Sequence, residues 1–128
     1  MSNATSILLI AALVVTLPLS STETVADTSK AKSKKKTAYG AIARHVDTGS
    51  LGYSYDLPSA RAANVAALEQ CAHERCEIVL SITNECGAIA DGPKNHIAKK
   101  GNTRAEAETR ALNACGKDCR PVAWACTR

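Results

Sequence analysis

Six cysteines are the residues of this sequence with the most evident chemistry, and all of them lie in its C-terminal half. Clustered thiols either ligate a metal ion or form disulfides. Structural zinc sites favour C-x2-C pairs, which are tighter than the spacings found here, so disulfides are the favoured interpretation and no metal ligand is assigned. His73, which falls between two of these cysteines, is interpreted as an exposed helix-end residue. The cysteines are Cys71, Cys76, Cys86, Cys115, Cys119 and Cys126.

The triplet Asp47-Thr48-Gly49 has the residue types found at the catalytic centre of aspartic proteases. That chemistry needs two carboxylates that share one proton, so a second triplet should be present. The corresponding position further along the chain reads Asp91-Gly92-Pro93 and supplies no match. The triplet is therefore interpreted as a polar β-turn.

His45, Ser54 and Asp56 have the residue types of a base, a nucleophile and an orienting carboxylate. In a strand, however, Ser54 and Asp56 share one face while Tyr53 and Tyr55 share the other, which favours a hairpin with a polar side and an aromatic side. The sequence contains no Gly-rich phosphate loop, H-E-x-x-H helix or nucleophile elbow. No catalytic residue and no cofactor is assigned.

An internal repeat organises the region that holds these residues. Tyr39-Gly40-Ala41-Ile42-Ala43 recurs as Cys86-Gly87-Ala88-Ile89-Ala90, and the segment 59–71 aligns with 103–115. The repeat predicts two units, 38–85 and 86–128, within one domain that spans residues 38–128. A length of 128 residues is consistent with a single folded domain.

Each unit is predicted to run strand, strand, helix, strand. Ser59 and Thr103 precede Ala-rich runs as helix caps, and Thr103 with Glu106 forms a capping-box pattern. Strands are expected over 39–44 and 52–56, with further strands over 77–83 and 121–127. The fold class is α+β: two such repeats form a mostly antiparallel sheet with two helices on one side, related by approximate two-fold symmetry and stapled by disulfides.

The core of this domain is expected to be thin, because the chain has no Phe and one Trp and relies on Ala for its apolar content. Trp124 is predicted to be buried as the one large aromatic of the core. Repeat symmetry predicts the disulfides Cys71–Cys76 and Cys115–Cys119 as equivalent staples. The remaining pair, Cys86–Cys126, is predicted to link the two units.

The N-terminal region is interpreted as a signal peptide over residues 1–26, because Ile7 to Leu19 is apolar and too short for a convincing membrane span. No basic residue precedes that stretch. Residues 27–37 form a predicted disordered linker, called the lysine tail below. Its cations are Lys30, Lys32, Lys34, Lys35 and Lys36. Weak contact with an anionic surface is one interpretation of these lysines, and a solvated spacer is the other.

The strings YGAIA, GYSYD, SARAANVAALEQC, CEIVLSITNECGAIA and TRAEAETRALNAC, closed by CRPVAWAC, resemble domain of unknown function 4189. The resemblance covers residues 38–128. It departs from the family at Leu51, where Trp is common, and over 96–100, where the family usually carries aromatic and glycine residues. The resemblance implies a small secreted protein, mostly found in bacteria, with no agreed biochemical activity.

The expected function is that of a secreted or periplasmic interaction domain whose partner is a protein or an envelope component. The alternatives are a small secreted hydrolase, or an inhibitor of a secreted hydrolase that would present a protruding loop such as Asp91 to Gly101. Nucleic acid is disfavoured as a partner because the lysine tail lacks interleaved stacking aromatics. The ligand and the oligomeric state are left open.

Overall fold

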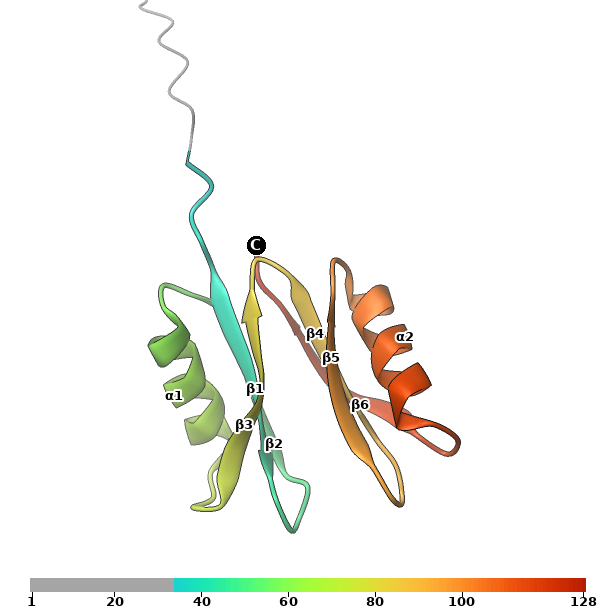
Figure 1. Cartoon of the computed structure of the whole chain (residues 1–128). Helices are drawn as coiled ribbons and strands as arrows, with labels where there is room; N and C mark the ends of the chain where they lie inside the picture. The colour runs from blue at the N-terminus through green and yellow to red at the C-terminus, as the bar shows by residue number, and fades with distance from the viewer. Residues whose placement is uncertain (1–33) are drawn as a thin grey trace, which may run out of the picture. The chain divides into compact units, whose positions relative to one another are not determined.

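The structure, a computed structural model, describes residues 34–128. The predicted leader, together with residues 27–33 of the lysine tail, lies outside the described residues. Residues 34–128 form one compact unit with two strand-strand-helix-strand repeats (Figure 1). The elements are β1 (Tyr39–His45), β2 (Leu51–Leu57), α1 (Ala60–Cys71), β3 (Cys76–Thr83), β4 (Cys86–Asp91), β5 (His96–Gly101), α2 (Arg104–Cys115) and β6 (Arg120–Cys126).

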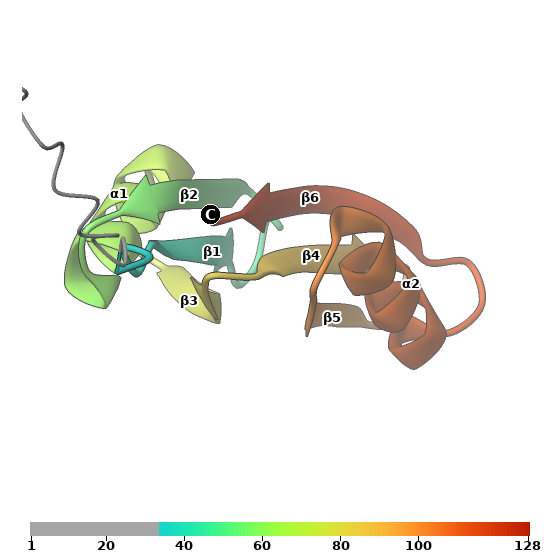
Figure 2. The same cartoon turned by 90° about the horizontal axis from the view of Figure 1, so that it is seen from above.

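The predicted repeat pattern and fold class are confirmed, but the strands form two sheets instead of one. The first repeat forms the antiparallel sheet β2-β1-β3 and the second forms the antiparallel sheet β5-β4-β6. Helix α1 packs on the outer side of the first sheet and α2 on the outer side of the second, so the layers run α1, sheet, sheet, α2 (Figures 1 and 2). The helices therefore lie on opposite sides of the molecule.

The central strands explain this layering, because both of their faces are buried. Ala41 and Ala43 of β1 face α1, where they pack with Ala63 and Ala67. Ile42, which lies between those two alanines, points to the opposite face and joins a cluster between the sheets. A single sheet with both helices on one side would leave this isoleucine face in water, at a cost of about 1.5–3 kcal/mol per side chain.

The second repeat follows the same rule. Ala88 and Ala90 of β4 pack against α2, while Ile89 points into the cluster between the sheets. Ile42, Ile82 and Ile89 are the largest fully buried side chains among the described residues. The repeated Gly-Ala-Ile-Ala string therefore accounts for this arrangement. In each copy the two alanines face a helix, and the isoleucine between them faces the cluster between the sheets.

Small residues also set how closely the helices approach the sheets. A Cβ atom added to Gly52 of β2 would lie 2.0 Å from the Ala67 carbonyl oxygen of α1, so only glycine fits at this crossing. The helix starts have the predicted caps: Ser59 Oγ accepts from Ala62 N–H at 3.1 Å. Thr103 Oγ1 accepts from Glu106 N–H at 3.2 Å.

Three disulfides complete the domain, and their pairing is the one that the repeat predicts. Cys71–Cys76 and Cys115–Cys119 each tie the end of a helix to the start of the next strand. Cys86–Cys126 joins the adjacent strands β4 and β6. The expectation that this third bond links the two units is wrong, since both strands belong to the second sheet. In the first sheet, the position that corresponds to this disulfide is occupied by the pair Tyr39 and Thr83, which lie opposite each other on β1 and β3.

The two repeats are joined by other contacts. Only Asn84 and Glu85 separate β3 from β4. Arg44 of β1 forms an ion pair with Asp91 of β4 at 3.5 Å. Beyond β6, the backbone N–H of Arg128 donates to Asp56 Oδ1 of β2 at 2.9 Å. Within residues 34–128, no helix is long and apolar enough to cross a membrane.

Candidate functional site

The residues considered for catalysis each have a local structural partner. His45 Nδ1 accepts backbone N–H groups from Asp47 at 3.2 Å and Thr48 at 3.0 Å, which holds the β1–β2 turn. Ser54 Oγ accepts from Ala41 N–H and donates to the Ala63 carbonyl of α1. The His45 imidazole and the Ser54 hydroxyl are thus both hydrogen-bonded to backbone groups, and these two side chains form no hydrogen bond with each other.

The Asp47-Thr48-Gly49 triplet forms the β1–β2 turn, as the sequence predicts. Asp47 pairs with Arg75, and Gly49 has the positive φ of 72° that the turn requires. His73 packs edge-on against His45 with ring centroids 5.1 Å apart. All six cysteines form disulfides. Within residues 34–128, no group of three His, Cys, Asp or Glu side chains is placed to hold a metal ion.

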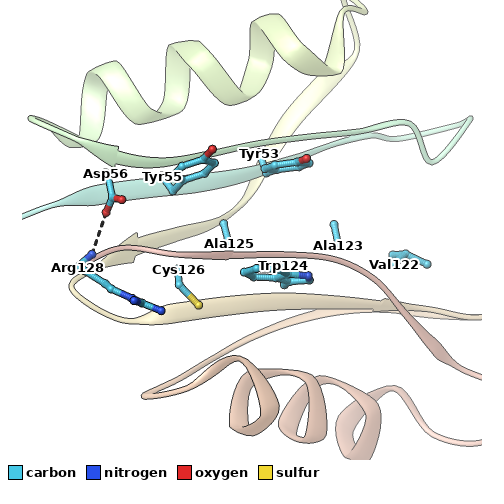
Figure 3. Close-up of a pocket in the computed structure, with 9 residues that line it drawn as sticks. All are labelled: Tyr53, Tyr55, Asp56, Val122, Ala123, Trp124, Ala125, Cys126 and Arg128. Carbon is cyan, nitrogen blue, oxygen red and sulfur yellow. Dashed lines mark hydrogen bonds between the residues drawn. The ribbon is translucent and has the colours of Figure 1, made fainter.

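Asp56 departs from the predicted face pattern of β2. The register between β1 and β2 shifts at this point, and Asp56 has a positive φ of 53°, which is the geometry of a β-bulge. Ser54 therefore faces α1, whereas Asp56 turns to the other side and bonds to Arg128 (Figure 3). The expectation that Ser54 and Asp56 share a face is wrong because of this bulge.

Trp124 is 42% exposed, so the prediction that it is a core residue is also wrong. Its neighbours Ala123 and Ala125 on β6 point into the cluster between the sheets, which places Trp124 on the outward face of the strand. The guanidinium carbon of Arg104, at the start of α2, lies 4.3 Å from the centroid of the indole ring. The one tryptophan of the chain is therefore a surface residue.

A groove runs along the side of the molecule where the edge strands β2 and β6 meet, and we call it the β2–β6 groove (Figure 3). It has a volume of about 560 Å³. One side carries Tyr53 and Tyr55, which are 42% and 58% exposed, and the other carries Ala123 and Trp124. Its lining residues are Tyr53, Tyr55, Asp56, Val122, Ala123, Trp124, Ala125, Cys126 and Arg128.

The groove follows from the side-chain alternation of two strands. Tyr53 and Tyr55 share the face of β2 that looks away from α1, and in Figure 3 both rings lie over Ala123 and Ala125 of β6. The small alanines leave open space beneath the rings. The hydrogen bond between Asp56 and Arg128 closes one end of this space.

The predicted tyrosine face of the β2 hairpin is thus part of the groove, whereas the contribution of β6 was missed. The Val-Ala-Trp-Ala alternation over 122–125 could have shown it, since small alanines on one face imply that the large side chains lie on the other. Of the lysine tail, Lys34, Lys35 and Lys36 are described and exposed. Contact of the tail with an anionic surface stays a prediction.

Fold and groove define a small disulfide-bonded α+β domain of two repeats with an aromatic surface groove. Residues 39–126 match the family described as domain of unknown function (DUF4189), and the chain belongs to this family.

Relatives occur in mycobacteria. The protein Rv1269c of Mycobacterium tuberculosis is 36% identical over 88 residues, which cover 69% of this chain and 68% of that protein. The uncharacterized protein Rv1813c of the same organism is 35% identical over 88 residues, which cover 69% of this chain and 59% of that one. The NMR structure of Rv1813c matches with a TM-score of 0.57 at 32% identity, over 70% of this chain and 74% of that structure.

Proposed function

We propose that this protein is an exported binding domain and that its ligand, a protein or an envelope component, binds in the β2–β6 groove. The observation that carries the proposal is the exposure of three large aromatic rings, Tyr53, Tyr55 and Trp124, around one hollow. The core contains few large side chains, so burial of these three rings in it would stabilise the fold. Their exposure therefore needs another explanation. Their grouping on one surface is typical of a recognition site.

The chemistry of the groove supports binding. Its aromatic and alanine side chains offer apolar contact area, while Asp56 and Arg128 place polar groups at one end. Tyrosine and tryptophan bring large contact areas with few rotatable bonds, which lowers the entropy lost when a ligand orders them. Ser54 and His45, which have catalytic residue types, are instead bonded to the backbone.

Two features support export from the cytoplasm. Disulfides persist in oxidising compartments, and all six cysteines form them here. The apolar segment from Ile7 to Leu19 has the length of a signal-peptide core. The proposed location is therefore secreted or periplasmic, where a domain with a thin core depends on its disulfides for stability.

Trp124 allows a direct test, because it lines the groove and is the only tryptophan of the chain. Purified oxidised protein is titrated with fractions of extracellular or periplasmic extract while the tryptophan emission is recorded. We expect a saturable shift of the emission in the wild type and its loss in the double variant Tyr53→Ala, Tyr55→Ala. Circular dichroism checks that the variant is folded.

Val65→Ala is the matched control, since Val65 is a 47% exposed apolar residue on α1 that does not line the groove. It should respond to ligand as the wild type does. A ligand that still binds the folded double tyrosine variant but not the Val65 variant would place recognition on α1 and contradict the proposal.

A further inference from the structure

Strand β6 is an open sheet edge along the groove. Among the strands of residues 34–128, it pairs with β4 on one side and with no strand on the other. The Cα atoms of Cys86 and Cys126 are 4.0 Å apart, which is the short spacing of a pair that exchanges no backbone hydrogen bonds. The N–H and C=O groups of Cys126, and those of Trp124 two residues earlier, therefore point away from β4 toward the open edge.

The facing edge, β2, is less accessible for strand pairing. The Tyr53 N–H group donates to Gln70 Oε1 of α1 at 2.6 Å, so this side chain covers the edge. The bulge at Asp56 interrupts the strand further along. Within residues 34–128, no hydrogen bond reaches the outward N–H groups of Trp124 and Cys126. Of the two edges, β6 is the one that offers free backbone groups.

Two hollows lie on opposite sides of the β6 edge. One is the β2–β6 groove, and the other, which we call the α2 hollow, has a volume of about 400 Å³ and lies beside the start of α2. Both hollows are lined by Trp124, Cys126 and Arg128. Side chains of a strand point alternately to its two faces, so a strand added to β6 would place successive side chains in the two hollows.

The two hollows differ in charge. The groove presents Tyr53 and Tyr55, which suit apolar side chains. The cations Lys35, Arg104 and Arg128 line the α2 hollow, and Arg104 is already paired with Glu108 at 2.8 Å, so within the described part of the chain Lys35 and Arg128 carry its unpaired charge. Glu85 is the one acidic side chain among the described residues that line this hollow, and it already pairs with Lys100 at 2.9 Å. The α2 hollow is therefore complementary to carboxylates.

The ends of the free edge are also defined. Pro121 has no N–H group, and the register of β4 with β6 shifts between Ala90 and Ile89, which limits regular pairing at that end. At the other end, Arg128 N–H is bonded to Asp56. The span available for pairing is Val122–Cys126.

We propose that the ligand of the groove is an extended peptide segment that adds to β6 as a further strand, with apolar residues alternating with acidic ones. The proposal rests on the binding function given above and names the chemistry of its ligand. Backbone pairing along Val122–Cys126 supplies affinity, and the alternation between the aromatic groove and the cationic α2 hollow supplies specificity.

The first experiment selects ligands without assuming a sequence. A displayed library of random peptides of about ten residues, longer than the free edge, is selected against the oxidised protein. We expect enriched peptides to carry aliphatic or aromatic residues at every second position with Asp or Glu between them. Enriched peptides without this period of two, or with Lys and Arg in place of the acids, would overturn the proposal, and so would a library without enrichment.

The second experiment tests backbone pairing with the selected peptide itself. Two versions are N-methylated on complementary sets of alternate amides, because only one set faces β6 in an added strand. Methylation of the facing set should weaken binding by at least about tenfold, and that of the other set by less than about twofold. Equal affinities for the two versions show that no strand pairing occurs and refute the proposal.

Charge reversal at Arg128 tests the α2 hollow. Arg128→Glu should lower the affinity for the selected acidic peptide by about tenfold. The matched control Arg61→Glu, on the exposed face of α1, should change that affinity by less than about twofold. Equal effects of both variants contradict recognition of carboxylates in this hollow. If a fraction of extracellular or periplasmic extract still shifts the Trp124 emission while no peptide is enriched, the strand proposal fails and the binding function remains.

Discussion

Removal of the Cys86–Cys126 disulfide should destabilise the domain more than removal of either helix-end disulfide. The bonded cysteines are separated by 40 residues in this pair, by 5 in Cys71–Cys76 and by 4 in Cys115–Cys119. In the chain-entropy treatment, a loop of this larger size contributes about 4 kcal/mol at 25 °C, while each short loop contributes about 2 kcal/mol. The expected difference in the free energy of unfolding is therefore about 2 kcal/mol.

Burial does not bias this comparison. Each disulfide has one well-buried cysteine, since Cys86, Cys71 and Cys115 are 7%, 3% and 4% exposed. Replacement of each pair by alanine thus removes similar apolar area and leaves similar space, so these contributions nearly cancel between the variants. Loop length remains as the main difference.

Urea unfolding of the three paired Cys→Ala variants is the assay. With m values of about 1–2 kcal/mol/M for a domain of this size, the expected difference separates the midpoints by about 1–2 M. The Cys86→Ala, Cys126→Ala variant should unfold first. Equal midpoints for the three variants, or a lower midpoint for one of the short-loop variants, would refute the entropic reasoning.

Four further outcomes are expected. Ile42→Ala removes the centre of the cluster between the sheets and should cost about 2–5 kcal/mol in urea unfolding. Trp124→Ala should lower the free energy of unfolding by less than the loss of about 3–5 kcal/mol that is typical of a core aromatic residue, because nearly half of Trp124 is exposed. A loss of the full size would show that the ring supports the fold. Gly52→Ala should prevent the close approach of α1, whose Ala67 carbonyl leaves no room for a Cβ atom, and circular dichroism and unfolding midpoints would show the loss. Co-sedimentation with anionic vesicles should fall as salt rises for the full chain, and a shortened chain that begins at Ala38 should not bind; equal binding of both chains would leave the lysine tail as a spacer.

The order of the secondary structure could be predicted because each element carries a local signal. Ser59 and Thr103 mark the helix starts, and the duplicated Gly-Ala-Ile-Ala string marks the central strands. The division into two sheets could not be predicted from the same signals. It depends on which partner covers Ile42 and Ile89, and alternation along a strand shows that a face is apolar without showing what lies opposite.

The candidate site was predicted only in part for a similar reason. Tyr53 and Tyr55 share a face in any regular strand, so their side of the groove follows from the sequence. The sequence predicts a buried Trp124 because it is the one large aromatic residue in a core otherwise made of Ala, Val, Ile and Leu. Its exposure depends on β6 being an edge strand with alanines turned inward, which is a property of the sheet order.

The short connection between β3 and β4 changes the physical meaning of the contact between the sheets. A single repeat on its own would expose its isoleucine face and could cover it only by associating with a second copy, with a stability that depends on concentration. Because Asn84 and Glu85 join the two repeats directly, each sheet meets its partner at a high effective concentration fixed by the covalent chain. The duplicated chain therefore keeps its central cluster intact at any dilution, because the contact between the sheets is intramolecular.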